Sequence, residues 1–319
     1  MAITYKELVE QDYKRQVEFN NVKWYHEHGF TGNGITILNA EGSGDHQRMT
    51  SGVIRDYAPD ATLLESVISG RTSGDKVLET TVVINFAPYP KTGERLDFEE
   101  AIDKYNIKVV TRSYSGPISK ARLDYFKDIQ KRKGVIFVNS AGNEGVNGVT
   151  GVWSKDDTAI AVGASYLTEK GEIKLHNYSA RGDELDFVSF MARGTGTSAA
   201  SPALAAKVVL LLQRYGDFNQ SECVEILKSL CFKIPGLSKQ EQGWGLPILP
   251  LTDKLDILEK MRGGNMVFKD VEQDRWSKSA IDFCVEKGLM IGFEDGTFRP
   301  TEPVTREQIA VILERLINL

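Results

Sequence analysis

Short, almost wholly apolar segments that alternate with helical patterns constrain the fold of this 319-residue chain more than any other feature. Residues 135–138 (VIFV) and 158–164 (TAIAVGA) are two such segments. Strands this apolar are buried on both faces, as in the middle of a parallel sheet. Residues 119–132 predict an amphipathic helix, and residues 199–215 predict an apolar one. The alternation therefore predicts an α/β fold with a mainly parallel sheet.

The pattern of predicted strands and helices changes near the C-terminal end of the sequence. The alternation of strand and helix patterns fades after Leu255, and residues 263–265 (GGN) have the composition of a linker. Residues 267–319 then predict two helices around a loop rich in glycine, aspartate and proline. We therefore expect a large domain over residues 1–262 and a small α-helical module over residues 267–319.

The bulk composition excludes some classes of partner. The net charge is −5, without the basic excess of proteins that bind nucleic acid or membrane surfaces. No stretch approaches the ~18 apolar residues of a membrane span, and the polar N-terminus lacks the apolar core of a signal peptide. We therefore expect a protein that is cytoplasmic as synthesised. The three cysteines, Cys223, Cys231 and Cys284, have no short-spaced pair, so we expect buried thiols and neither a disulfide framework nor a zinc site.

Ser198 stands between a small-residue turn and a long apolar helix. Residues 196–198 (GTS) precede the helical pattern, which places the serine hydroxyl at a helix N-terminus. There, unpaired N–H groups and the helix dipole favour developing negative charge, and small residues let a substrate backbone approach. The alternative is that Ser198 or Thr197 only caps the helix.

Three ordered segments resemble the subtilisin family. The family's serine motif is Gly-Thr-Ser-x-Ala-x-Pro, and residues 196–202 match it at every fixed position. Residues 138–145 (VNSAGNEG) resemble the strand end that carries the family's oxyanion asparagine, here Asn143. Residues 177–186 (NYSARGDELD) resemble the stretch before the serine loop, and the resemblance covers roughly residues 20–255.

The resemblance implies a subtilisin-like fold, doubly wound around its parallel sheet, and a serine endopeptidase. Ser198 would be the nucleophile that forms an acyl-enzyme. The side-chain N–H of Asn143 and the backbone N–H of Ser198 would stabilise the oxyanion of the tetrahedral intermediate. The alternative for Asn143 is a simple turn, because Gly and Asn are turn residues.

A histidine follows the first strand pattern. The family's pattern is His-Gly-Thr-His-x-x-Gly with the first histidine catalytic, and residues 46–52 (HQRMTSG) keep only His46 and Gly52 of its fixed positions. Residues 58–61 (APDA) follow at the spacing expected of the family. His46 would take the proton of Ser198, since an imidazole titrates near neutral pH. The alternative is a solvated surface histidine.

The third member of a catalytic triad is the open question. The family has Asp at the end of the first strand, where this chain has Asn39, which carries no charge. Glu41 lies two residues further on, and Asp45 directly precedes His46. We predict Glu41 as the acid that orients the imidazole, because adjacent residues seldom face each other. Asp45 remains an alternative for this acid, and a further alternative is that the third triad member is absent.

The resemblance also implies a substrate cleft and the absence of a calcium site. Ser113, Tyr114, Ser115 and Gly116 follow a strand pattern, and the family's corresponding segment binds extended substrate by strand addition. The insertion that builds the family's calcium site has no counterpart between residues 52 and 58. We therefore expect no metal at that place and no cofactor.

The C-terminal segment resembles one S-layer homology repeat. Residues 268–271 (FKDV), 288–292 (GLMIG) and 295–300 (DGTFRP) match its pattern, and residues 304–308 (VTREQ) resemble its signature apart from the final glutamine. The resemblance implies binding to secondary cell-wall polysaccharide, with Arg306 as the anion-binding residue. The alternative is an arginine on a solvated helix face.

Three functional hypotheses follow. The first is an active serine endopeptidase acting on protein or peptide substrates, associated with the cell wall after release. The second is an inactive subtilisin-fold protein used for binding or assembly, which the uncharged Asn39 favours. The third is a phage- or prophage-linked processing protein, since lysis would release a wall-binding protein that has no signal peptide.

Overall fold

The computed structural model describes most of the chain, in two compact units, Met1–Thr252 and Asp253–Leu319. The predicted linker, residues 263–265, lies outside the described residues, so the predicted domain bounds of 1–262 and 267–319 stay a prediction. The described residues are 13–41, 44–67, 81–85, 96–116, 118–145, 148–151, 153–154, 158–191, 196–261, 268–272, 274–286, 289–290, 292–293 and 295–317.

The first unit is built on a nine-stranded sheet in the order β4-β3-β2-β1-β5-β6-β7-β8, with β9 also paired to β7. All strand pairs in it are parallel except that of β7 with β8. The strands are β1 (Thr36–Asn39), β2 (Thr62–Val67), β3 (Thr81–Asn85), β4 (Leu96–Asp97), β5 (Ile107–Arg112), β6 (Ile136–Ser140), β7 (Ile160–Leu167), β8 (Ile173–Leu175), β9 (Phe187–Phe190), and the separate pair β10 (Cys231–Phe232) and β11 (Leu246–Pro247).

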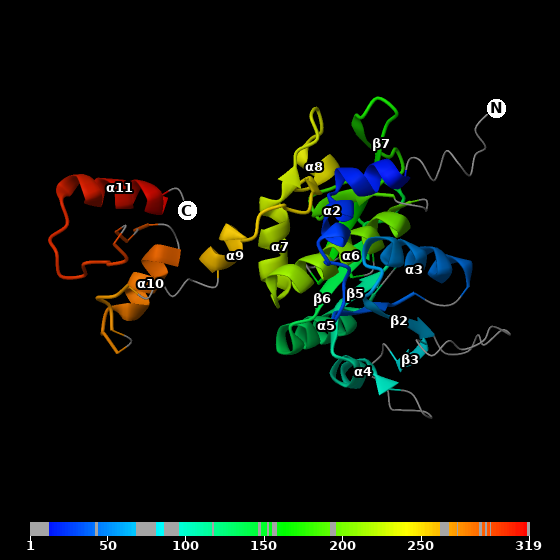
Figure 1. Ribbon diagram of the computed structural model, residues 1–319, viewed down its shortest axis with the longest axis horizontal. Helices are drawn as coiled ribbons and strands as arrows, with labels where there is room; N and C mark the ends of the chain where they lie inside the picture. Colours follow the sequence, from blue (N-terminus) through cyan, green and yellow to red (C-terminus); the bar gives the residue numbers. More distant parts are fainter. Residues whose placement is uncertain are drawn as a thin grey trace. The chain divides into compact units, whose positions relative to one another are not determined.

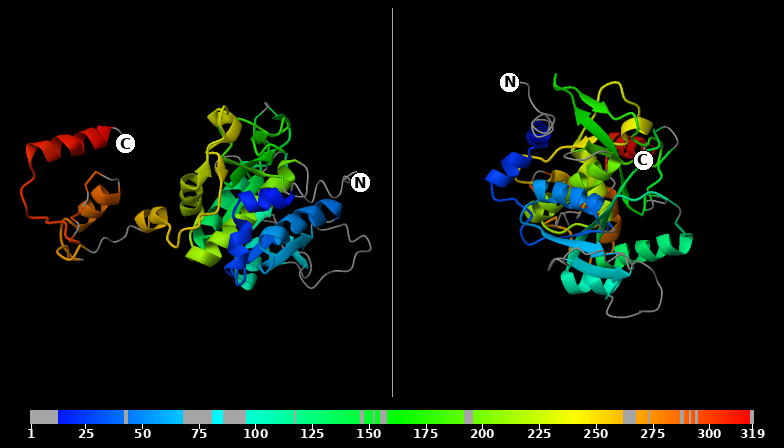
Figure 2. Two further views of the ribbon diagram at one scale, coloured as in Figure 1. Left: turned by 45° about the horizontal axis from the view of Figure 1, so that its top comes forward. Right: turned by 90° about the vertical axis from the view of Figure 1, so that its right-hand side faces the viewer.

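Helices cover both faces of this sheet (Figures 1 and 2). One face carries α3 and α6, which contact each other, and the opposite face carries α4 and α5. The helices of the first unit are α2 (Val22–Glu27), α3 (Asp45–Tyr57), α4 (Phe98–Tyr105), α5 (Lys120–Lys133), α6 (Thr197–Tyr215), α7 (Gln220–Ser229) and α8 (Lys239–Gln242). The predicted doubly wound α/β fold is thereby confirmed.

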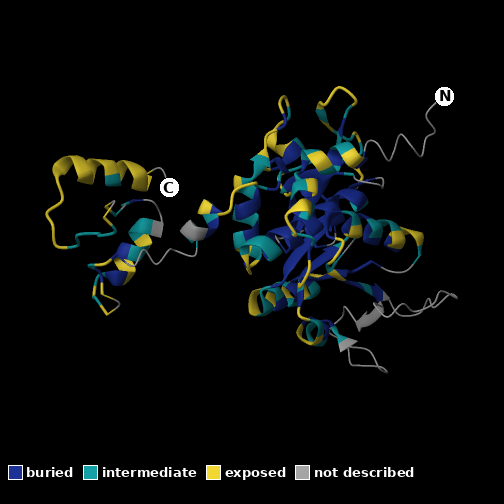
Figure 3. Ribbon diagram, viewed as in Figure 1, coloured by how far each residue is buried: buried dark blue, intermediate teal, exposed yellow. Residues whose placement is uncertain are grey.

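The apolar segments form strands and helices as their patterns predict. The strand β6 is buried along its whole length, as its apolar sequence requires. The helix α5 ends at Gly134, which adopts the left-handed conformation (φ 67°) that suits glycine as a helix C-cap. In α6 every residue from Ala199 to Leu212 is buried, which makes it the central helix of the unit (Figure 3).

The core beneath α4 and α5 is aromatic. Phe126 from α5 and Phe137 from β6 pack against the fully buried Trp153, with ring centroids 5.0 and 5.4 Å from it. Phe98 from α4 completes the cluster at 5.5 Å from Phe126. These contacts anchor the strands β5 and β6, whose carboxyl ends carry the candidate site.

The second unit has a small core. Phe268, Val271 and Ile281 are buried, and Val285 and Phe298 pack against them. Its helices are α9 (Asp256–Met261), α10 (Lys278–Glu286) and α11 (Arg306–Ile317). No residue of α11 is buried. Among the described residues, none of the helices is long and apolar enough to cross a membrane.

Candidate active site

Ser198 lies in the first turn of α6, half-buried, at the edge of the sheet where the parallel strands end. The residue that caps this helix is Gly196, and no side chain caps it. Gly196, and neither Ser198 nor Thr197, therefore holds the N-cap position. A first-turn N–H has no carbonyl partner within its own helix, so the backbone N–H of Ser198 is not used by the hydrogen bonds of α6.

A proline in α6 leaves the Ser198 carbonyl free to bind the segment that follows β5. Pro202 has no N–H, so the carbonyl of Ser198, four residues earlier, cannot form its helical hydrogen bond. That carbonyl instead accepts a hydrogen bond from Ser113 Oγ (3.1 Å), which follows the carboxyl end of β5. The proline of the serine motif thus frees an acceptor that positions Ser198 against β5.

Glu41 is held at the same edge by an extension of the β1–β5 pairing. Past the end of β1, the Ala40 N–H donates to the Thr111 carbonyl (2.8 Å). The Glu41 carboxylate then accepts a hydrogen bond through Oε1 from the backbone N–H of Ser113. The side chain of Glu41 is only 5% exposed, so this bond and the next one compensate its desolvation.

The second oxygen of Glu41 contacts His46. Glu41 Oε2 lies 3.1 Å from His46 Nδ1, and the imidazole is 47% exposed. The hydrogen bond with Glu41 raises the pKa of His46, with partial burial opposing it. The contact occupies Nδ1 and leaves Nε2 as the nitrogen available to a substrate or nucleophile.

The other two candidates for the acid lie elsewhere. Asn39 is fully buried and donates through Nδ2 to Thr50 Oγ1 (2.8 Å) and Ser51 Oγ (2.9 Å), so its amide joins β1 to α3. Asp45 is 95% exposed and pairs with Arg48. The structure brings Glu41, and neither of these residues, to the imidazole.

Asn143 faces the start of α6. Its Oδ1 accepts hydrogen bonds from Thr197 N (2.9 Å) and Thr197 Oγ1 (3.1 Å). A backbone N–H can only donate, so the contacting atom must be the oxygen and the orientation of the carboxamide is fixed. The donor end of the amide, Asn143 Nδ2, is not used by these two bonds. Sequence reasoning missed that Thr197 orients this carboxamide, although Thr197 stands within the motif that identified Ser198.

The segment from Ser113 to Gly116 begins beside Ser198, since Ser113 Oγ donates to the Ser198 carbonyl. Tyr114 is 55% exposed, while Ser115 forms an antiparallel bridge with Gly151 and Gly116 N donates to the Thr150 carbonyl (3.2 Å). One side of the segment is therefore paired within the chain. Strand addition by a substrate at this segment stays a prediction.

The proposed base and nucleophile are not hydrogen-bonded to each other. Within the described part of the chain, no hydrogen bond joins His46 to Ser198. Contacts between catalytic groups are often loose without substrate and tighten in the complex. An indirect chain of contacts nevertheless joins His46 to Ser198. His46 contacts Glu41, Glu41 accepts from the Ser113 N–H, and Ser113 Oγ donates to the Ser198 carbonyl.

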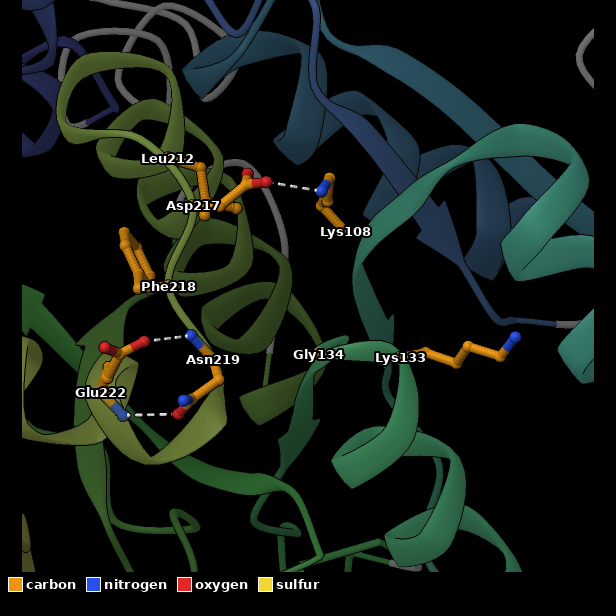
Figure 4. A pocket seen from close by; sticks show the side chains of 8 residues that line it. All are labelled: Lys108, Lys133, Gly134, Leu212, Asp217, Phe218, Asn219 and Glu222. Atoms are coloured by element: carbon orange, nitrogen blue, oxygen red, sulfur yellow. Dashed lines mark hydrogen bonds and ion pairs between the residues drawn. The ribbon is translucent and has the colours of Figure 1, made fainter. Parts of the chain in front are cut away.

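Other candidate sites offer little chemistry. A hollow of about 260 Å³ lies at the amino ends of β5 and β6, lined by Lys108 and Gly134 among others (Figure 4). Lys108 pairs with Asp217 at 2.8 Å, and Asn219 and Glu222 cap α7 reciprocally. These groups are satisfied by one another, on the edge of the sheet away from Ser198.

Among the described residues, no group of three or more His, Cys, Asp or Glu side chains could hold a metal ion. The three cysteines are free thiols. Arg306, the predicted anion-binding residue, is the first residue of α11 and is exposed.

The chain matches two known families. Residues 3–245 match the subtilase family, and residues 267–310 match the S-layer homology domain. The first match covers more than half of the chain, and it contains Glu41, His46, Asn143 and Ser198.

Solved structures share the fold of the first unit. Fervidolysin from Fervidobacterium pennivorans, a keratinolytic enzyme related to subtilisin, is 16% identical with a TM-score of 0.56, over 76% of this chain and 45% of its own. A protease from Pseudoalteromonas arctica is 14% identical with a TM-score of 0.54, over 74% of this chain and 95% of its own. At such identities the likeness concerns the fold alone.

Curated relatives share a short segment. The outer membrane protein SlpA of Deinococcus radiodurans is 45% identical over 49 residues, which is 15% of this chain and 4% of SlpA. An S-layer protein of Bacillus licheniformis is 40% identical over 52 residues, which is 16% of this chain and 6% of the relative. The chain thus spans a small fraction of the length of these relatives.

Proposed function

The chain belongs to the subtilase family, and from that premise we propose that it is a serine endopeptidase that cleaves peptide bonds through an acyl-enzyme on Ser198. One observation carries the proposal. The buried carboxylate of Glu41 lies 3.1 Å from His46 Nδ1, which is the arrangement that a triad acid requires. Glu41 therefore takes the role that Asn39 cannot perform.

In the proposed reaction His46 acts first as a base. Its Nε2 removes the proton of Ser198 Oγ as that oxygen attacks the carbonyl carbon of the substrate. The resulting oxyanion accepts hydrogen bonds from Asn143 Nδ2 and from the N–H of Ser198. His46 then gives its proton to the leaving amine, and a water molecule activated by the same imidazole hydrolyses the acyl-enzyme.

Glu41 has two tasks in this scheme. By accepting from Nδ1–H it selects the tautomer whose Nε2 is unprotonated and can act as the base. When His46 becomes an imidazolium, the adjacent carboxylate stabilises that charge in a partly desolvated place. The residues from Ser113 to Gly116 would hold the substrate backbone in the cleft.

A fluorophosphonate probe tests the proposal directly, because it labels only an activated serine. We expect the wild-type protein to be labelled and to cleave a generic peptide, and Ser198→Ala to do neither. Ser201→Ala is the matched control, since Ser201 lies on the same helix but its hydroxyl contacts Thr111 at 3.2 Å. Labelling that survives in Ser198→Ala would assign the reaction to another residue.

A second function, binding or assembly without catalysis, has one observation in its favour. The imidazole of His46 is half-exposed, and no hydrogen bond joins it to Ser198 among the described residues. An unlabelled wild-type protein that is folded by circular dichroism would support this second function and refute the first.

We further propose that the S-layer homology domain attaches the protein to the cell surface by binding secondary cell-wall polysaccharide. Arg306 is exposed at the start of α11, where its planar guanidinium can form paired hydrogen bonds with an anionic group. Sedimentation with purified cell walls should show binding that Arg306→Gln weakens. The neighbouring exposed Glu307→Gln is the control, and equal binding by both variants would refute the role of Arg306.

A further inference from the structure

One short segment contacts both loops that form the oxyanion site. In residues 178–181, the Tyr178 carbonyl accepts from Gly145 N (2.9 Å) and Ala180 N donates to the Gly142 carbonyl (3.0 Å). The loop from Gly142 to Gly145 carries Asn143. Residues 178–181 therefore hold the asparagine side of the site through backbone hydrogen bonds alone.

The side chain of Tyr178 reaches the other loop, the one that leads to Ser198. Its hydroxyl accepts a hydrogen bond from Gly196 N (2.7 Å) and donates one to Met191 Sδ (2.7 Å). Met191 directly follows β9, and Gly196 directly precedes α6. One hydroxyl thus contacts both ends of the connection between β9 and the nucleophile helix.

The ring of Tyr178 is itself fixed. It stacks on the imidazole of His176 with ring centroids 3.6 Å apart. Burial raises the pKa of Tyr178, so the phenol stays protonated and keeps its donor at neutral pH. A neutral hydroxyl can then accept from Gly196 and donate to Met191 at the same time.

The position of Gly196 determines that of the oxyanion donor. Gly196 has a φ of 77°, and a Cβ added there would lie 3.0 Å from Asn143 Oδ1 and 3.1 Å from Asn143 Nδ2. Its backbone therefore packs directly on the carboxamide. The next N–H, that of Thr197, donates to Asn143 Oδ1 at 2.9 Å. A shift of Gly196 would move both the carboxamide and the hydrogen bond that orients it.

We propose that the hydroxyl of Tyr178 is a positioning group for the oxyanion site, acting through Gly196 on Asn143. It touches neither the nucleophile nor the substrate carbonyl. This inference rests on the proposed peptidase function, because it assigns the hydroxyl to stabilisation of that reaction's transition state. Residues 177–186 resemble a family segment as a whole, but nothing in the sequence distinguished Tyr178 within that segment.

Tyr178→Phe removes the hydroxyl and keeps the ring. We expect kcat, and the rate of fluorophosphonate labelling, to fall about tenfold with KM unchanged, as for the loss of one hydrogen bond that acts in the transition state. Tyr166→Phe is the matched control, since that ring also lies against His176, at 5.7 Å, and its hydroxyl has no partner among the described residues. Equal rates in the wild type and Tyr178→Phe would overturn the proposal.

A double-mutant cycle separates positioning from a structural role. If Tyr178 acts through Asn143, Tyr178→Phe should lower kcat less than twofold when Asn143 is already replaced by alanine, because the donor that Tyr178 positions is then missing. A full tenfold fall in kcat in the Asn143→Ala background would overturn the proposal.

Amide exchange gives a readout that does not depend on activity. By NMR, the Gly196 amide should exchange faster in Tyr178→Phe than in the wild type and Tyr166→Phe. An unchanged exchange rate refutes the positioning role by itself. A wild-type protein that the probe does not label refutes the proposed function instead, so the two failures are distinguishable.

Discussion

At the scale of single residues, the site depends most on Glu41. A buried carboxylate is costly unless its oxygens have partners, and here one oxygen binds the Ser113 backbone while the other binds His46. The bond to Ser113 fixes the carboxylate just past the end of β5, beside the imidazole. In the proposed triad Glu41 replaces the family's aspartate from a different position in the chain, and we propose that its longer side chain spans the difference.

Glu41→Gln should lower kcat by roughly three to four orders of magnitude with KM little changed, because an amide can hold the wrong imidazole tautomer. Steady-state kinetics on a generic peptide substrate measures this. Asp45→Asn is the matched control and should keep near-wild-type activity, since Asp45 is exposed and pairs with Arg48. The opposite result for the two variants would transfer the acid role to Asp45.

The titration of His46 provides a second prediction. Because its hydrogen bond with Glu41 raises the pKa of His46, the NMR titration midpoint of the imidazole should lie above the ordinary value of 6.5 and should fall in Glu41→Gln. The contact of His46 with Glu41 stabilises the folded state fully at pH values below the pKa of His46 in the unfolded chain. This stabilisation is lost as the pH rises through the raised pKa of His46 in the folded state. An unchanged midpoint in Glu41→Gln would contradict the contact.

At the scale of elements, α6 carries both Ser198 and a buried lysine. Lys207 lies further along the same helix, is 1% exposed, and donates through Nζ to Asn20 Oδ1 (3.1 Å) and the Pro247 carbonyl (2.7 Å). The lysine therefore ties α6 to the N-terminal segment and to β11. Burial lowers the pKa of Lys207 to about 7, because a charged ammonium is poorly solvated there.

Lys207→Met should change the pH dependence of stability. Between about pH 7 and 10.5 the unfolded chain binds the lysine proton and the folded chain does not, so the free energy of unfolding of the wild type should rise with pH over that window. The variant should lack this rise, amounting to a few kcal/mol, in urea melts at several pH values. The exposed Lys120→Met is the control, and parallel pH curves for the wild type and Lys207→Met would contradict the lowered pKa.

At the scale of the whole molecule, the described part of the first unit is stabilised by its buried apolar side chains. The helix α3 runs without insertion from Asp45 to Tyr57, through the stretch where the family's calcium-binding insertion is missing. No metal-binding group occurs among the described residues. The burial of α6 and of the aromatic cluster below β6 stabilises the unit.

Chelation should therefore leave the melting temperature unchanged. We expect calorimetric melts of the full chain with EDTA and with added calcium to agree within error. A metal ion bound at ~100 times its dissociation constant would contribute about 2.7 kcal/mol and shift the melt visibly. A lower melting temperature in EDTA would reveal a metal site that this sequence does not predict.

The sequence by itself determined the parallel sheet, the helix that Ser198 opens and the place of Asn143 after β6. These features depend on local patterns. Wholly apolar runs are typical of strands that are buried on both faces of a sheet, and a turn of small residues precedes an apolar helix. Such patterns involve neighbours along the chain, so no knowledge of distant contacts is needed to read them.

Only the tertiary structure decided which carboxylate meets His46, which side chains Asn39 binds and which groups the Tyr178 hydroxyl contacts. Glu41 accepts from Ser113 just past the end of β5, Asn39 donates to Thr50 of α3, and the Tyr178 hydroxyl accepts from Gly196 before α6. These contacts join residues 11, 18 and 72 positions apart in the sequence, and the geometry of the longest one follows from the register of β1 on β5. Local propensity contains no information about that register, because side-chain partners across a sheet are selected by the packing of the whole domain.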